Sequence, residues 1–420
     1  METVKKYFTQ IFDKIRAFVA KFFNSFIRSK TKNMNNKIVF INQCTGYLTV
    51  DIVNAFADTG KYEKIALISG GIKESDSLNS SVKLSFIKPY NKKTKWKRTK
   101  SWTIGTIQSL FLVLFKYRGY HLFLFSNPPT TSFITLFCRN TYSTLIYDVY
   151  PEGLVLAKFI SRKSLINKLW SKFNRRFYRK AKHIFTITKG MSEGIKKYNP
   201  DINVQVIPLW NNSFSGIPED KSSNNFINMH GLQNKFIVMY SGNMGKGHDI
   251  ETLVQIARIL KTESEIVFVF IGDGWKKPLI FNLINDLNLR NCLLLPLQPV
   301  EMLPHSLSAA DIAVVISPAE TENVCTPSKV YNMLALGKPI LSIAGKKSEM
   351  YRLTKKYDFG ICYSNNNISD LVKFVIRLKH SKHEYQKYHK KSLIASNNNF
   401  TIKNTQKFVK ALETICPNKK

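Results

Sequence analysis

Acidic residues are scarce in this chain. Its 420 residues include 28 Asp and Glu against 63 Lys and Arg, which gives a formal net charge of +35. A surplus of this size indicates an anionic partner, which could be a membrane surface, a nucleic acid or a phosphorylated substrate. The 44% hydrophobic content excludes a disordered chain, and the length is sufficient for two domains of ordinary size.

Patterns that hold metals or build disulfide frameworks are missing. The six cysteines are scattered and none forms a C-x-x-C pair, which argues against a structural zinc site and a disulfide scaffold. No metal-ligand spacing joins His121, His183 and His248. This cysteine usage is compatible with a reducing cytoplasm.

Two common phosphate-binding motifs and the usual membrane signals are also absent. The sequence has no Walker motif, and no G-x-G-x-x-G fingerprint follows the first strand of either half. The N-terminus lacks the apolar core and cleavage site of a signal peptide. The longest uncharged run, residues 119–138, is interrupted by His121, Asn127, Pro128 and Pro129, so we predict no transmembrane helix.

Residues 1–36 form a separate basic and aromatic unit. Apolar side chains recur between Phe8 and Ile27 at helical spacing, and Lys and Arg occupy most of the rest of the helical wheel. This pattern favours an amphipathic helix lying in an anionic membrane interface. The alternative is a terminal helix packed on the protein's own core.

From residue 37 onward, short apolar strands alternate with helices. The first series predicts an N-terminal domain over 37–210, and the second predicts a C-terminal domain over 233–395. A polar linker, 211–232, separates them, and a helical tail, 396–420, follows. The pattern predicts an α/β fold with two doubly wound parallel sheets, which leave a cleft at the carboxyl ends of their strands.

Three polar turns follow predicted strands of the second half, at residues 242–247, 272–274 and 320–329. They should converge, because the carboxyl ends of parallel strands lie at one edge of a sheet. Glycine allows the backbone to approach a ligand closely, and Lys246 and Lys329 offer point charges for phosphate. We therefore predict a nucleotide site at this edge.

The third turn continues into a predicted helix. Pro327 and Ser328 indicate its start, with Thr326 or Ser328 as the cap, and Gly337 ends it. Free backbone N–H groups beside Lys329 would form an anion site. The alternative is an ordinary α/β connection.

As a set, these motifs resemble the family 4 glycosyltransferases of GT-B fold. The likeness covers about residues 37–410, and residues 147–152 are similar to a run in amino-sugar transferases of O-antigen and capsule assembly. The matching segments are YSGN (240–243) with KG (246–247), FIGDG (270–274), AADI (309–312), PSKVY (327–331), GKP (337–339), SNPP (126–129), YDVYPE (147–152) and IPLWN (207–211).

The resemblance implies a nucleotide-sugar donor in the C-terminal domain and an acceptor in the N-terminal domain. Transfer would retain the anomeric configuration and need neither a metal nor another cofactor. Lys246 would meet the charge that develops on the diphosphate, and the base would rest near Leu297. The donor residues that we infer are Gly46, Gly242, Asn243, Gly247, Gly272, Asp273, Gly274, Leu297, Thr326, Pro327, Ser328, Lys329 and Asn332.

The sequence departs from the family pattern at the donor site. The two Glu that the family usually carries seven residues apart are Val324 and Asn332 here. Asn332 can still hydrogen-bond ribose, and Glu320 or Glu322 could reach the sugar instead. Asn243 stands where an Arg is common, which gives Lys246 a larger part of the diphosphate role.

Asp148 and Glu152 are the acidic candidates of the first half, because both lie near the end of a predicted strand. With Lys246, they are the predicted catalytic residues. Asp148 could orient the acceptor hydroxyl or the donor sugar, and Glu152 could do the same. The alternative for Asp148 is that it braces the turn before Pro151.

We therefore predict a peripheral enzyme on the inner face of the cell membrane. It would move a sugar, with UDP as the expected nucleotide, to a saccharide carried on undecaprenyl diphosphate. A glycolipid synthase that uses a diacylglycerol or lipid A acceptor is the alternative within this class. A nucleic-acid-binding protein would need a binding module, and none is visible. The retained Lys246 argues against a partner-binding scaffold built on an inactive transferase.

Overall fold

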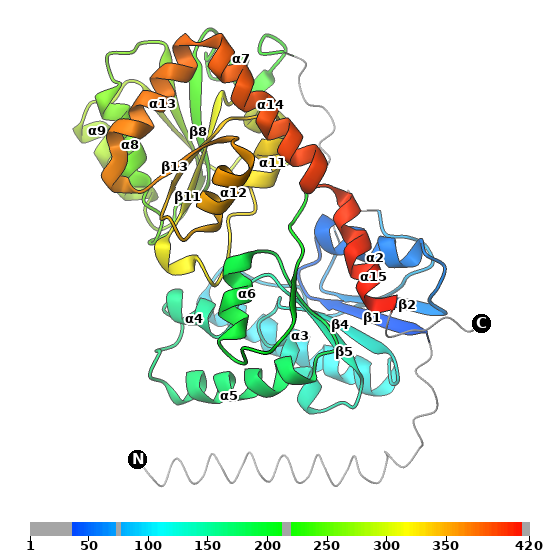
Figure 1. Ribbon diagram of the computed structural model, residues 1–420. Helices are drawn as coiled ribbons and strands as arrows, with labels where there is room; N and C mark the ends of the chain where they lie inside the picture. Colours follow the sequence, from blue (N-terminus) through cyan, green and yellow to red (C-terminus); the bar gives the residue numbers. More distant parts are fainter. Residues whose placement is uncertain (1–35, 73–76, 212–219, 414–420) are drawn as a thin grey trace.

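A computed structural model of the protein describes residues 36–72, 77–211 and 220–413. It consists of two α/β domains, one above the other in Figure 1. The amphipathic helix that the sequence predicts over residues 1–32 lies outside the described residues. No described helix has the length and apolar character needed to cross a membrane.

The N-terminal domain is built on a parallel sheet of seven strands in the order β3-β2-β1-β4-β5-β6-β7. Its central strands are apolar on both faces because helices cover both sides of the sheet. The strands are β1 Lys37–Asn42, β2 Lys64–Ser69, β3 Lys83–Phe86, β4 His121–Phe125, β5 Tyr142–Ile146, β6 Ile184–Thr186 and β7 Val204–Val206. The helices are α2 Tyr47–Ala57, α3 Lys95–Phe115, η1 Thr131–Leu136, α4 Glu152–Leu156, α5 Leu165–Lys180 and α6 Lys189–Lys196.

The C-terminal domain repeats this architecture with six parallel strands in the order β10-β9-β8-β11-β12-β13. The strands are β8 Phe236–Asn243, β9 Ile266–Asp273, β10 Cys292–Leu295, β11 Ile312–Ser317, β12 Ile340–Ala344 and β13 Gly360–Tyr363. The helices are α7 Asn225–Met229, α8 Ile250–Ile259, α9 Lys277–Asp286, α10 Leu303–Ser308, η2 Ala319–Thr321, α11 Val330–Ala335, α12 Glu349–Tyr357, η3 Asn365–Asn367, α13 Ile368–His380, α14 Lys382–Asn399, η4 Ile402–Asn404 and α15 Thr405–Glu413. The two parallel sheets confirm the predicted α/β architecture.

Two segments link the domains. After α14 has followed the C-terminal domain, α15 lies beside α2 of the N-terminal domain (Figure 1). The buried Phe408 ring of α15 is 4.9 Å from Phe185 and 6.1 Å from Phe123, between ring centroids. The second segment follows β7 and leads into the C-terminal domain. Its Trp210 donates through Nε1 to Asp51 Oδ2 (2.7 Å). The tail therefore completes the N-terminal core.

Helix α7 lies inside the range that the sequence predicts as linker. Its Phe226 and Ile227 are fully buried in a cluster with residues of β8 and β9. Asn224 caps the helix by accepting from the N–H groups of both residues, at 2.9 and 3.2 Å. A helix this short depends on the burial of its apolar side chains. The sequence pattern did not indicate it, because the residues on either side of α7 are mostly polar.

The basic segment 88–100 is a loop only in its first part, and its second part is helical. Helix α3 begins at Lys95, because the Thr94 side chain accepts from the Lys97 N–H (3.1 Å) and so caps it. Lysine and arginine are good helix formers, so a run of cations does not stop a helix.

Candidate functional site

The glycine-rich segments of the C-terminal domain are strand ends, not free turns. Strands β8 and β9 extend further than predicted, so Gly242 pairs with Gly272 and Asn243 with Asp273. Gly272 has a φ of +155°, and a Cβ there would overlap the Gly242 carbonyl oxygen. The close approach that requires this glycine is therefore between two strands of the protein itself.

The two predicted phosphate lysines lie at the carboxyl end of β8. The exposed Lys246 places Nζ 4.4 Å from the ring centroid of Trp275, which is itself 64% exposed. Lys329 comes from the other side, and its Nζ donates to the Ser241 carbonyl at 3.0 Å. The strand order places β8 between β9 and β11, so the loops that follow these three strands meet there.

Helix α11 differs from the prediction. It begins at Val330 with Lys329 as its N-cap and no capping side chain, so the predicted caps Thr326 and Ser328 are wrong. The helix has only six residues, because Gly337, at a φ of +67°, ends the turn after it. Residues 326–329 are thus a loop at the sheet edge, and Asn332 is a half-buried helical residue.

Lys338, in the matching Gly-Lys-Pro segment, belongs to the fold. Its Nζ donates to the Ser308 carbonyl (2.7 Å), and burial lowers the pKa of its ammonium group to about 8. This lysine therefore holds α10 against the strand β12 and is not aimed at the predicted phosphate position.

An open groove lies at the carboxyl end of β9. It has a volume of about 350 Å³, and it lies beside the predicted donor residues Asp273 and Gly274, between α9 and β10. Leu297 and Val300, just beyond β10, are 60% and 67% exposed. Exposed apolar side chains beside a groove of this size are a suitable surface for a flat ring.

Gly46 lies at the matching edge of the N-terminal sheet, at the start of α2. A Cβ built at Gly46 would meet nothing within 4 Å, so the protein's own packing does not require glycine at this position. Gly247, in the C-terminal domain, is exposed in the loop after β8.

Asp148 follows β5, at the carboxyl end of the parallel sheet of the N-terminal domain. The Ser126 hydroxyl oxygen accepts from the N–H groups of Tyr147 (2.9 Å) and Asp148 (3.3 Å), which fixes the turn. Tyr150 donates to Asp148 Oδ2 at 3.5 Å. Burial raises the pKa of the Asp148 carboxyl group to about 6, although the Tyr150 hydroxyl partly offsets this effect.

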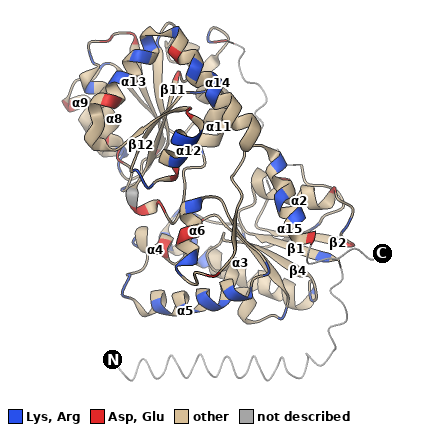
Figure 2. Ribbon diagram, viewed as in Figure 1, with Lys and Arg blue, Asp and Glu red and all other residues tan. Residues whose placement is uncertain are grey.

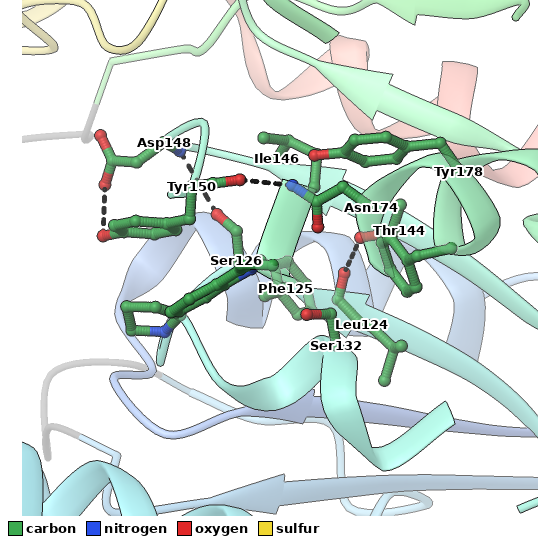
Figure 3. A pocket seen from close by; sticks show the side chains of 13 residues that line it. Leu124, Phe125, Ser126, Ser132, Thr144, Ile146, Asp148, Tyr150, Asn174 and Tyr178 are labelled. Atoms are coloured by element: carbon green, nitrogen blue, oxygen red, sulfur yellow. Dashed lines mark hydrogen bonds between the residues drawn. The ribbon is translucent and has the colours of Figure 1, made fainter. Parts of the chain in front are cut away.

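The cavity beside Asp148 is small. Figure 3 shows Asp148, Tyr150 and Ser126 at one end and Asn174 and other polar and apolar side chains around it. Its volume of about 20 Å³ is sufficient for about one water molecule, and therefore not for a sugar.

Glu152 has different surroundings from Asp148. It lies in the first turn of α4, where Oε1 accepts from the Tyr198 hydroxyl (2.7 Å). Its other carboxylate oxygen is buried, with no hydrogen-bond partner among the described residues. The structure thus ties Glu152 to the segment after α6, whereas Asp148 lies beside Tyr150.

A contact between the domains brings the two halves of the site together. The Val149 N–H donates to the Val324 carbonyl (2.9 Å), so the Asp148 turn touches the loop that leads into residues 326–329. This loop also rests on α6, where a Cβ at Gly190 or Gly194 would overlap the carbonyl oxygen of Glu322 or Asn323. This packing contact was not predicted from the sequence, although the Gly-x-x-x-Gly spacing on α6 could have indicated it.

Across residues 36–72, 77–211 and 220–413, no group of three or more His, Cys, Asp and Glu side chains is placed to hold a metal ion.

Comparison with known proteins supports the predicted family. Residues 223–395 match the family model "Glycosyl transferases group 1". WbjE of Pseudomonas aeruginosa, named as a glycosyltransferase, is 28% identical over 220 residues, which are 51% of this chain and 54% of WbjE. WcaI of Escherichia coli, named as a colanic acid biosynthesis glycosyl transferase, is 26% identical over 212 residues, 49% of this chain and 52% of WcaI. The chain thus spans about half the length of these curated relatives.

The fold is shared more widely than the sequence. The crystal structure of HepE from Anabaena in complex with UDP-glucose superposes with a TM-score of 0.62, over 90% of this chain and 99% of HepE, at 11% identity. This likeness, together with the two parallel sheets, confirms the predicted GT-B fold.

Proposed function

We propose that this chain, whose residues 223–395 match the family model of the group 1 glycosyl transferases, is a retaining, metal-independent enzyme that transfers a hexosyl or N-acetylhexosaminyl group from a UDP-sugar. The acceptor is a saccharide linked to a lipid diphosphate, in the assembly of a cell-surface polysaccharide. The observation that carries this proposal is the bond from Val149 to Val324, which joins the turn of Asp148 to the loop of Lys329.

The charged residues at the carboxyl ends of the two sheets suit this reaction. The departing nucleoside diphosphate gains negative charge as its bond to the sugar breaks, and fixed cations near it lower the barrier. Lys246 is the exposed cation at the carboxyl end of β8, and Lys329 is held to the same strand through Ser241. Asp148, as a carboxylate, would orient the acceptor hydroxyl from the opposite domain.

A UDP-linked donor is supported by the solved complex of HepE with UDP-glucose and by the groove beside Asp273. We expect UDP at a hundred times its dissociation constant to stabilise the chain by about 2.7 kcal/mol. For a domain of this size, that corresponds to a rise in melting temperature of roughly 5–10 °C. The measurement is a thermal-shift titration in EDTA with UDP, GDP, ADP and uridine. Stabilisation by GDP or ADP but not UDP would contradict the choice of donor.

The proposed place of action is the inner face of the cell membrane, and α5 supports it. Leu165, Ile166 and Leu169 are each more than half exposed, and α5 contains no Asp or Glu. Figure 2 shows cations along the whole helix. Apolar side chains that insert between lipids, next to cations that meet anionic headgroups, are the features of an interfacial helix.

We therefore expect the triple change Leu165→Ser, Ile166→Ser and Leu169→Ser to weaken binding to phosphatidylglycerol vesicles at least about tenfold, because full burial of one aliphatic side chain contributes about 1.5–3 kcal/mol. A flotation assay with the full chain measures this. The control pair Ile259→Ser and Ile394→Ser changes equally exposed residues of the C-terminal domain. If both variants lost vesicle binding equally, or if the triple variant lost none, α5 would not be the membrane-contacting helix.

A further inference from the structure

A cluster of aromatic rings and cations lies beside the Asp148 turn and has no part in the site described above. The rings of Tyr90 and Trp102 stack with centroids 6.1 Å apart and planes at 4°, and Phe159 lies 6.4 Å from Trp102. Lys95 Nζ and Arg98 Cζ lie over the Phe159 ring, at 5.2 and 5.3 Å from its centroid. The cluster joins the N-terminal half of α3 to the segments that precede α3 and follow α4.

The cluster is anchored to the cleft end of the sheet through Gln43. This buried residue follows β1, and its Nε2 donates to the carbonyls of Lys88 (2.7 Å) and Ser101 (2.8 Å). Gly105 of α3 makes room for it, because a Cβ there would overlap the Gln43 amide. These contacts hold α3 and the Tyr90 segment in a fixed relation to β1.

Two N–H donors inside the cluster have no acceptor. Trp102 Nε1 and Arg98 Nε are both buried and lack a hydrogen-bond partner among the described residues. The other Arg98 contact is long, from Nη2 to the Lys92 carbonyl at 3.5 Å. Buried donors are nearly always paired in folded proteins, and leaving one unpaired costs free energy, so two of them one helical turn apart indicate a missing acceptor.

The charge around these donors is not compensated. From Ser77 to Tyr147 the chain has no Asp or Glu, whereas residues 88–100 include six Lys and Arg after Lys88 itself. None of these cations forms an ion pair with another described residue; the ion pairs of the structure lie elsewhere. The uncompensated positive charge therefore favours an anion as the hydrogen-bond acceptor of Arg98 Nε and Trp102 Nε1.

The cluster also adjoins the reacting edge of the domain. Tyr90 is close enough to Tyr150, the partner of Asp148, to help raise the pKa of the Tyr150 hydroxyl, after burial and Asp148 itself. The cluster therefore extends from the proposed position of the acceptor hydroxyl, near Asp148, to the start of α3.

We propose that the Tyr90, Trp102, Phe159, Lys95 and Arg98 cluster binds the phosphate-ester group of the acceptor. Arg98 Nε and Trp102 Nε1 donate to its oxygens, Lys95 balances its charge, and the Tyr90 ring packs against the first sugar. Phe159 covers the donors, so the phosphate gains access when this side chain rotates. This inference rests on the proposed function, because it presumes an acceptor that carries a phosphate ester.

The test is isothermal titration calorimetry with geranyl diphosphate, in saturating UDP so that the donor site is occupied. We expect Arg98→Gln to raise the dissociation constant about tenfold and Trp102→Phe severalfold, since hydrogen bonds to a charged group are lost. Lys97→Gln is the matched control: it removes one charge from an exposed residue next to Arg98, and we expect less than a twofold change.

Three outcomes would overturn the inference. The first is an equal loss of affinity for geranyl diphosphate in Arg98→Gln and Lys97→Gln. The second is that geraniol binds as tightly as geranyl diphosphate. The third is that glycerol 3-phosphate binds more tightly than geranyl diphosphate, which would assign the site to a phospholipid headgroup. Thermal shifts with UDP separate the two hypotheses. If UDP stabilises every variant while geranyl diphosphate fails to bind the wild type, this inference falls and the proposed function stands. If UDP fails as well, the proposed function falls.

Discussion

Replacing Lys246 with alanine should lower kcat/KM for sugar transfer at least about hundredfold, because the loss of one preorganised group that stabilises developing charge typically costs a factor of 10²–10³. Lys246 is the exposed lysine at the carboxyl end of β8, whereas Lys329 is already engaged with the Ser241 carbonyl. Asn243, at the place where related enzymes often carry Arg, brings no charge.

The fold should survive the Lys246→Ala change. The ammonium group lies over Trp275, which is mostly exposed, and a cation–π contact at such a site is worth about 0.5–1 kcal/mol. Steady-state transfer assays and thermal unfolding together measure the effect. Lys261→Ala, at an exposed residue after α8, is the control and should keep its turnover. Wild-type turnover in Lys246→Ala would refute the assignment of this lysine to the diphosphate.

The regular parts of the fold could be predicted from the sequence because they depend on short-range patterns. Buried parallel strands are continuous apolar runs, and every residue of β11 is buried, so a strand of this kind can be recognised from the sequence. Helices α4 and α7, with five residues each, have too few turns to show a periodicity and exist because their neighbours bury them.

The candidate site was predictable in its location but not in its contacts. The strand ends that carry Lys246, Asp273 and Asp148 follow from the βα alternation, because the loops that follow the strands of one parallel sheet all lie at the same edge. The contact of residues 322–323 with Gly190 and Gly194 joins positions about 130 residues apart. The Gly-x-x-x-Gly spacing on α6 indicates a close approach there, but it does not identify the partner segment. The glycine at 272 was assigned to ligand approach, but the adjacent strand already requires it.

Replacing Asp148 with asparagine should lower kcat by about 10² or more, which is the range for a positioned acid or base, and should remove one limb of the pH profile. In the wild type, burial raises the pKa of this carboxyl group to about 6. The carboxylate that orients an acceptor hydroxyl is therefore lost as the pH falls through about 6. We expect wild-type kcat/KM, which reports the pKa values of the free enzyme, to rise between about pH 5 and 7 and then level off, whereas the residual activity of Asp148→Asn should lack this rise.

The stability of this variant separates a catalytic role from a structural one. Because the folded-state pKa of Asp148 is raised above the value of an unfolded chain, its contribution to stability is present at low pH and is lost as the pH rises through about 6. At pH 8 an uncharged asparagine should therefore leave the chain at least as stable as the wild type, although its turnover has collapsed. Glu152→Gln is the informative partner, since Glu152 is bound to Tyr198 and should keep the acid limb of the profile. A less stable Asp148→Asn protein that retains that limb would instead mean that Asp148 only braces the turn before Pro151.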